Sequence, residues 1–131
     1  MEESKIKISV VDDNEMMCTE IINFLSDTND FDICPPAYNY EQGLKIIESC
    51  KPDVVLVDLN LKSGPSGSDL IREIRKRNLS CRCIAISAHT RDHLSLHCRQ
   101  QAISHYVSKF DIIDQLVPMI RSILNKQPNV S

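Results

Sequence analysis

The sequence predicts an α/β fold, a doubly wound sandwich in which helices cover both faces of a five-stranded parallel sheet. Five short strand-like segments alternate with five helix-like segments, the order typical of parallel strands joined by helices. Two of the strand-like segments, VVLV and CIAI, are apolar throughout, as strands buried on both faces require. With 131 residues, of which 42% are hydrophobic, the chain is long enough for one core and too short for two.

Each predicted strand ends where an apolar run meets a polar residue. Residues 5–11 alternate polar and apolar side chains, become fully apolar, and stop at Asp12. The other strands are predicted at residues 31–34, 54–57, 83–86 and 105–108. Polar residues stand at the ends of the first, third, fourth and fifth strands, so the functional residues are expected there.

The predicted helices repeat apolar residues three or four positions apart. The first begins at Glu15, with Asn14 or a neighbour available as N-cap. The others are predicted at residues 40–49, 68–77, about 92–100, and after Lys109. Pro118 removes a backbone hydrogen bond from the last helix, so that helix either starts near Asp114 or kinks.

Composition and charge argue against several classes of function. The net charge of -3, without a long basic run, argues against direct nucleic-acid binding by this chain. No apolar stretch has the length of a membrane span and the first residues are acidic, so a cytoplasmic protein with no membrane contact is expected. We predict one domain over residues 1–126, followed by a polar tail or linker stub at 127–131.

The six cysteines are scattered without CxxC spacing. This pattern argues against a zinc site or a disulfide framework and favours reduced thiols. Cys81 and Cys83 come nearest to a ligand pair, but residues two apart on a strand share one face and commonly pack there.

The strand ends carry three carboxylates, a hydroxyl and an amine: Asp12, Asp13, Asp58, Ser87 and Lys109. Ligands bind beyond the carboxyl ends of an open parallel sheet, and a strand order of 2-1-3-4-5 would bring the first two aspartates against Asp58. Crowded carboxylates repel unless a cation lies among them, and oxygen ligands open to water suit Mg²⁺. Asp58 is then a candidate nucleophile towards phosphorus, with Lys109 and Ser87 holding phosphoryl oxygens.

Each of these residues also has a simpler interpretation. The Asp12-Asp13 pair could open a turn and favour the positive end of the next helix, Ser87 could be a cap, and Lys109 a solvated charge. Their joint occurrence at the correct strand ends favours the functional interpretation.

From Lys5 to Lys126 the chain resembles the receiver domains of two-component response regulators. Four motifs in order carry the resemblance: VVDDN for the acidic pair, PDVVLVDLNL for the phosphoacceptor strand, AISAH for the Thr/Ser-Ala motif, and HYVSK for the aromatic-x-x-Lys motif. The first half is most similar to regulators of the NarL/LuxR type, which carry a helix-turn-helix output domain. The resemblance implies a flavodoxin-like, CheY-like fold with strand order 2-1-3-4-5.

The resemblance also implies function. A sensor histidine kinase or phosphotransfer protein would supply the phosphoryl group to Asp58, and the chain would be a switch rather than an enzyme. Asp13 and Asp58 would bind Mg²⁺ directly, Asp12 through water, and Asn60 through its backbone carbonyl.

Ser87 and Tyr106 would be the switch residues. They would remodel the face built from the fourth helix, the fifth strand and the fifth helix, which would control an output such as transcription and is a candidate homodimer surface.

Several positions depart from the family pattern. Phe110 follows the lysine where proline is usual, Lys62 also replaces a proline, and Gly67 comes one place late, which suggests a loop longer by one residue. His105 and Ile103 replace small residues. These departures bear on switching more than on phosphorylation.

Three histidines, His89, His93 and His97, recur at i,i+4 spacing. They could bind a metal or sense pH, and the simpler interpretation is an exposed row. His89 lies two residues after Ser87, where it could influence water access to a phosphoryl group.

Rival functions are distinguishable in the sequence. A phosphatase with an aspartate nucleophile needs a second acid two residues on, where Asn60 stands. A nucleotide or flavin site needs a glycine-rich loop after the first strand, where DDNEM has none. A pseudo-receiver, folded alike but not phosphorylated, remains the alternative to a working receiver.

Overall fold

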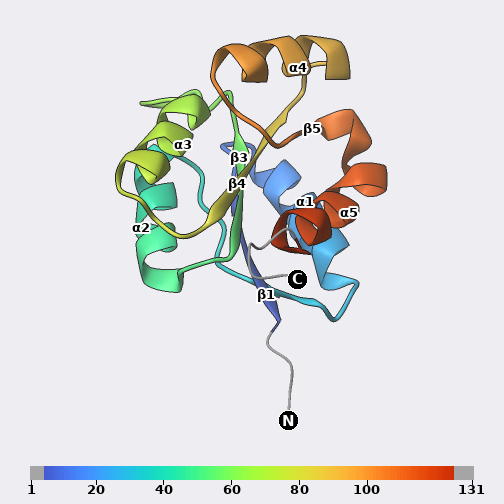
Figure 1. Ribbon diagram of the computed structural model, residues 1–131. Helices are drawn as coiled ribbons and strands as arrows, with labels where there is room; N and C mark the ends of the chain where they lie inside the picture. Colours follow the sequence, from blue (N-terminus) through green and yellow to red (C-terminus); the bar gives the residue numbers. More distant parts are fainter. Residues whose placement is uncertain (1–4, 126–131) are drawn as a thin grey trace.

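Five parallel strands form one sheet in the order β2-β1-β3-β4-β5, as predicted (Figure 1). The computed structural model describes residues 5–125. The strands are β1 (Ile6–Val11), β2 (Phe31–Ile33), β3 (Val54–Asp58), β4 (Arg82–Ser87) and β5 (Tyr106–Ser108). The order reverses between β1 and β3, where Val11 pairs with Val57, so the residues that follow these two strands are neighbours.

The helices are α1 (Glu15–Ser26), α2 (Tyr40–Cys50), α3 (Gly67–Lys76), α4 (Arg91–Gln100) and α5 (Ile112–Asn125), with a 3-10 turn, η1 (Lys109–Asp111), before the last. Three of them, α1, α2 and α3, begin at side-chain caps, and the cap of α2 is Asn39. Asn14 Oδ1 accepts a hydrogen bond from the Met17 amide, 3.1 Å away, as predicted for α1. Ser66 and Asp69 form a capping box at α3.

Two apolar clusters fill the spaces on either side of the sheet. Helices α1 and α5 pack on one face, where Ile21, Leu25 and Leu116 meet Val10 and Leu56. The other face packs against α2, α3 and α4, through residues that include Ile47, Leu70 and Leu94. All four central apolar residues of β3 are fully buried, which confirms the prediction that the VVLV segment is covered on both sides.

A start near Asp114 was one of two expectations for the last helix, the other being a kink; the helix begins two residues earlier, at Ile112, and contains Pro118. The 3-10 turn at Lys109–Asp111 precedes it. Pro118 therefore lies past the first turn, at an exposed position, where it has no amide hydrogen to donate to the carbonyl of Asp114.

The expectation of six reduced cysteines is wrong for one pair, because Cys34 and Cys50 form a disulfide. Cys34 follows β2 and Cys50 ends α2, and their Cα atoms are 6.4 Å apart across a sequence separation of 16. The return of α2 along the sheet brings the two residues together, and cysteine spacing does not reveal such a contact. Cys18, Cys81, Cys83 and Cys98 are free.

Within residues 5–125 no helix combines the length and the apolar character needed to cross a membrane. The expected domain end at 126 and the tail at 127–131 lie outside the described residues.

Candidate functional site

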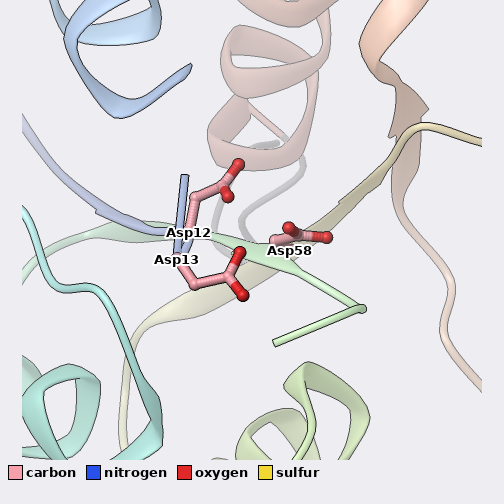
Figure 2. A group of neighbouring side chains, drawn as sticks. All are labelled: Asp12, Asp13 and Asp58. Atoms are coloured by element: carbon pink, nitrogen blue, oxygen red, sulfur yellow. The ribbon is translucent and has the colours of Figure 1, made fainter. Parts of the chain in front are cut away.

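Three aspartates gather where β1 and β3 end (Figure 2). One carboxylate oxygen from each of Asp12, Asp13 and Asp58 lies within 4.8 Å of the others. Asp12 is fully buried, Asp58 is 4% exposed, and Asp13 is half-buried. The reversal of strand order between β1 and β3 thus produces the predicted grouping of carboxylates.

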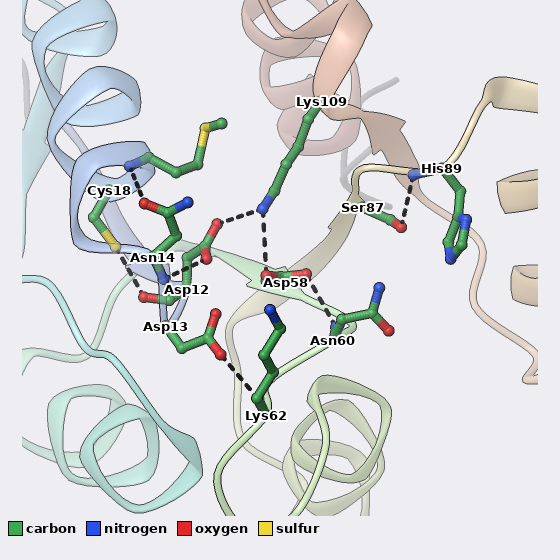
Figure 3. A network of polar contacts seen from close by, with 11 residues as sticks. Asp12, Asp13, Asn14, Cys18, Asp58, Asn60, Lys62, Ser87, His89 and Lys109 are labelled. Carbon is green, nitrogen blue, oxygen red and sulfur yellow. Dashed lines mark hydrogen bonds and ion pairs between the residues drawn. The ribbon is translucent and has the colours of Figure 1, made fainter.

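Backbone amides orient each carboxylate (Figure 3). The amide of Asn14 donates to Asp12 Oδ1 at 2.9 Å, and that of Asn60 donates to Asp58 Oδ1 at 3.0 Å. Asp13 Oδ2 accepts from the amide of Lys62 at 3.0 Å, so the β3–α3 loop reaches back to the end of β1. Asp12 and Asp58 are therefore held by the loops that follow their own strands, and Asp13 by the loop that follows β3.

Lys109 supplies the positive charge nearest to this group. Its ammonium lies 2.9 Å from Asp12 Oδ2 and 3.3 Å from Asp58 Oδ2, and its side chain is 14% exposed. Burial by itself lowers the pKa of Lys109, but the hydrogen bond that Lys109 donates to Asp12 and the charges of Asp58 and Asp12 raise it above its ordinary value. Lys109 is therefore a cation that bridges the ends of β1 and β3.

Burial has the opposite consequence for Asp12. It raises the pKa of the Asp12 carboxyl to about 6, and the neighbouring charge of Asp58 acts in the same direction. The Asn14 amide and Lys109 oppose this rise. Ionisation of the buried Asp12 carboxyl is therefore unfavourable, and a further cation beside it would favour the ionised form.

The donor set indicates which cation fits. The clustered side-chain ligand atoms are all carboxylate oxygens, which a hard ion such as Mg²⁺ prefers, whereas Zn²⁺ prefers nitrogen and sulfur. Asp13 is only partly buried, so such an ion could keep several waters. The residues present therefore fit Mg²⁺.

The side chains of Ser87 and Tyr106 form hydrogen bonds with the β4–α4 loop and with α4, and not with the aspartates. Ser87 is the fully buried last residue of β4, one position beyond the residue that pairs with Asp58. Its Oγ accepts a hydrogen bond from the His89 amide at 3.2 Å. Tyr106 opens β5, is half-buried, and donates its hydroxyl hydrogen to Ser95 Oγ in α4 at 3.0 Å. In this conformation the tyrosine hydroxyl is engaged by α4.

Two further residues support the site and were missed as functional by the pattern of strand ends. The Cys18 thiol donates to the backbone carbonyl of Asp12 at 3.2 Å, and burial, followed by the charge of Asp12, raises its pKa to about 11. Gly67, noted only for its late place in the loop, contacts the backbone of Asp58. Neither contact has a signal in the local sequence, since each joins different elements.

The three histidines at i,i+4 spacing are exposed, as the simpler interpretation predicts. They are also brought to one surface cavity of about 350 Å³, here called the histidine cavity. Its lining consists of Leu59, Asn60, Ser87, His89, His93, Leu96, His97 and Gln100. The histidine cavity thus adjoins the ends of β3 and β4.

The chain is similar in sequence to known response regulators. The family model described as the response regulator receiver domain matches residues 8–121. Response regulator GacA of Pseudomonas syringae is 27% identical over 126 residues, which cover 96% of this chain and 58% of that protein. The nitrate/nitrite response regulator protein NarL of Escherichia coli is 34% identical over 80 residues, 61% of this chain and 37% of that protein. The chain therefore spans less than two thirds of these relatives.

A solved structure shows the same fold. The CheY-like response regulator receiver domain protein from Methanospirillum hungatei superposes with a TM-score of 0.79 at 20% sequence identity. The match covers 95% of this chain and 97% of the other.

Proposed function

Because the chain belongs to the response regulator receiver domain family, we propose that it is a phosphorylation-controlled switch of a two-component system whose phosphoacceptor is Asp58. The observation that carries the proposal is the position of this carboxylate. It lies beside two other aspartates, and the Lys109 ammonium is 3.3 Å from its Oδ2. An anionic phosphoryl donor can approach a carboxylate nucleophile only where nearby cations offset their mutual repulsion.

Each residue has a role in the proposed transfer. An Asp58 carboxylate oxygen attacks phosphorus as the bond between phosphorus and the donor's nitrogen or oxygen breaks, which forms an acyl phosphate. Lys109 neutralises the anionic oxygens, and Ser87 donates its hydroxyl hydrogen to one of them after the β4–α4 loop has moved. Asp12, Asp13, Asp58 and the Asn60 carbonyl would hold Mg²⁺, which when bound lowers the negative charge of the reacting groups.

The switch in this proposal uses Ser87 and Tyr106. When Ser87 turns towards the phosphoryl group it moves away from the His89 amide, and this change loosens the loop that leads into α4. The Tyr106 hydroxyl then leaves Ser95, and the ring turns inward. The altered surface is the one formed by α4, β5 and α5, where an output domain or a second copy of the chain would bind.

The proposed phosphoryl source is a sensor histidine kinase or a phosphotransfer protein. The segment shared with this chain covers 58% of GacA and 37% of NarL, so both relatives have a further region outside it. The proposed output is control of transcription through such a separate region. Residues 1–126 would be the receiver domain, and 127–131 the start of a linker. In this role the chain is a signalling switch and has no turnover on a separate substrate.

The test is intact-mass measurement after incubation with acetyl phosphate and Mg²⁺. We expect an addition of about 80 Da, the mass of a phosphoryl group, that disappears in Asp58→Asn and when Mg²⁺ is chelated. The matched control is Asp53→Asn, because Asp53 lies at the opposite end of β3, where it accepts from the Lys7 amide. If folded wild type gains no mass from acetyl phosphate or from a cognate kinase, the chain is an interaction module that phosphorylation does not control.

A further inference from the structure

We propose that the histidine cavity binds a divalent transition-metal ion, such as Zn²⁺, through His93, His97 and His89. The three imidazoles come from α4 and from the β4–α4 loop, and all three line the same cavity. This site uses other ligands than the acidic group of Asp12, Asp13 and Asp58, and it does not depend on phosphorylation.

The helix places two of the ligands in a chelating arrangement. His93 and His97 are one helical turn apart in α4, so their side chains leave the same face of the helix. Two histidines four residues apart on one helix face are an arrangement known to bind Zn²⁺. An ion held by both would therefore lie over the histidine cavity.

His89 approaches the same position from the loop. Its backbone is fixed, because its amide donates to Ser87 Oγ at 3.2 Å and its carbonyl accepts from Ser108 Oγ at 2.8 Å. Its ring is exposed, and Figure 3 shows His89 beside Ser87. The ring centroids of His89 and His93 are 6.5 Å apart, with the ring planes tilted by 45°.

Among the described residues only the three aspartates have ligand atoms within 4.8 Å of one another, so the imidazoles must turn towards a common point to bind an ion. Zn–N bonds of about 2.0–2.1 Å place the centroids of two bound imidazoles about 5 Å apart, so the His89 and His93 rings need to approach by roughly 1–1.5 Å. Within residues 5–125 no hydrogen bond or ion pair holds either ring in place. Rotation about χ1 and χ2 of these exposed side chains therefore breaks no contact of that kind.

The chemistry of the lining selects the class of ion. The side chains around the histidine cavity include three imidazoles, an amide from each of Asn60 and Gln100, and no carboxylate. Neutral nitrogen ligands suit Zn²⁺, Ni²⁺ and Cu²⁺, whereas Mg²⁺ prefers the oxygen ligands of the aspartates. The histidine cavity would therefore bind the transition-metal ion and the aspartates would bind Mg²⁺, although both sites lie at the carboxyl ends of the strands.

The test is calorimetric titration of the tag-free chain with Zn²⁺, in excess Mg²⁺ and without a phosphoryl donor. We expect one site whose affinity falls at least tenfold in His93→Gln and in His97→Gln, and further in the double variant. His105→Gln is the matched control, because His105 is the fourth histidine and lies outside the histidine cavity. Circular dichroism verifies that the variants fold.

Two further measurements separate this site from the other possible ligands. Asp58→Asn should leave the Zn²⁺ affinity unchanged, and the Co²⁺ complex should lack a sulfur-to-metal charge-transfer band, since no free cysteine lines the histidine cavity. Unchanged Zn²⁺ affinity in the double histidine variant, loss in Asp58→Asn, or a thiolate band would each overturn the proposal. Because no phosphoryl donor is present, none of these outcomes bears on the phosphoacceptor role of Asp58.

Discussion

Gly67 lies directly against the backbone of Asp58. A β-carbon at Gly67 would be 2.0 Å from the Asp58 carbonyl oxygen and 2.8 Å from the α-carbon of Leu59, so no side chain fits there. The Gly67 amide also donates to the Leu59 carbonyl at 3.2 Å. The first residue of α3 therefore packs against the backbone that carries the proposed phosphoacceptor.

Gly67→Ala should impair phosphorylation more than stability alone explains. The added methyl group pushes the backbone of Asp58 or α3 aside, and we expect phosphorylation by acetyl phosphate to slow at least tenfold, with a loss of roughly 1–3 kcal/mol in the free energy of unfolding. Gly64→Ala is the control: its β-carbon meets no atom within 4 Å, but φ is +80°. That variant should cost about 1 kcal/mol and phosphorylate normally. Equal rates in the two variants would contradict the role of Gly67.

Stability without metal should depend on pH through Asp12. Its pKa is about 6 in the folded chain, against an ordinary value of 3.8, so the folded state binds this proton more tightly than the unfolded state. The resulting stability is fully present below about pH 4 and is lost as pH rises through about 6, a change of roughly 2–3 kcal/mol. Because Mg²⁺ binds the ionised carboxylates, it should stabilise the chain more at pH 7.5 than at pH 5. Urea titrations at both pH values, with Mg²⁺ or with EDTA, measure this difference, and Asp12→Asn should reduce it.

Lys109→Met should destabilise the metal-free chain at neutral pH. The substitution leaves the buried carboxylates of Asp12 and Asp58 without their shared cation, and we expect a loss of roughly 2–4 kcal/mol. The loss should be smaller at pH 5, where Asp12 is mostly protonated, and added Mg²⁺ should recover part of it at pH 7.5. A loss that is the same at both pH values would show that Lys109 acts through packing alone.

The hydrogen bond between Tyr106 and Ser95 should be measurable as a coupling. Tyr106→Phe and Ser95→Ala each remove the 3.0 Å contact between β5 and α4, at a cost of about 0.5–1.5 kcal/mol each. Since both variants remove the same bond, the double variant should lose less than the sum of the two single losses. A double-mutant cycle by urea denaturation tests this expectation, and strict additivity would mean that the contact contributes nothing.

Reduction of the Cys34–Cys50 disulfide should lower stability. The bond closes a loop with a sequence separation of 16, for which the chain-entropy estimate is about 3 kcal/mol. Dithiothreitol should therefore shift the unfolding midpoint of the wild type to lower urea. The double variant Cys34→Ser/Cys50→Ser should start from the lower value and show no response. A wild type that is insensitive to dithiothreitol would mean that this pair contributes no cross-link.

The sequence was sufficient for the fold class, for nearly all element boundaries within a residue or two, and for the grouping of Asp12, Asp13 and Asp58. The elements follow from short-range patterns, and the grouping of the aspartates also needs the strand order that the family resemblance implied. Strand and helix periodicities identify the elements, and parallel strands place their final residues on one edge of the sheet. Asn14 as the cap of α1 was likewise readable from its place before the first helical turn.

Only the tertiary structure decided which distant residues touch. Lys109 forms ion pairs with Asp12 and Asp58, Gly67 packs against the backbone of Asp58, and Cys34 forms a disulfide with Cys50. The i,i+4 spacing predicted that the three histidines form an exposed row. Only the tertiary structure showed that this row lines a cavity beside Ser87. The physical reason is the same in each case. Periodicity specifies which face of an element is buried, whereas the distance between side chains on different elements depends on how crossovers and loops pack, and that information is spread over the whole chain.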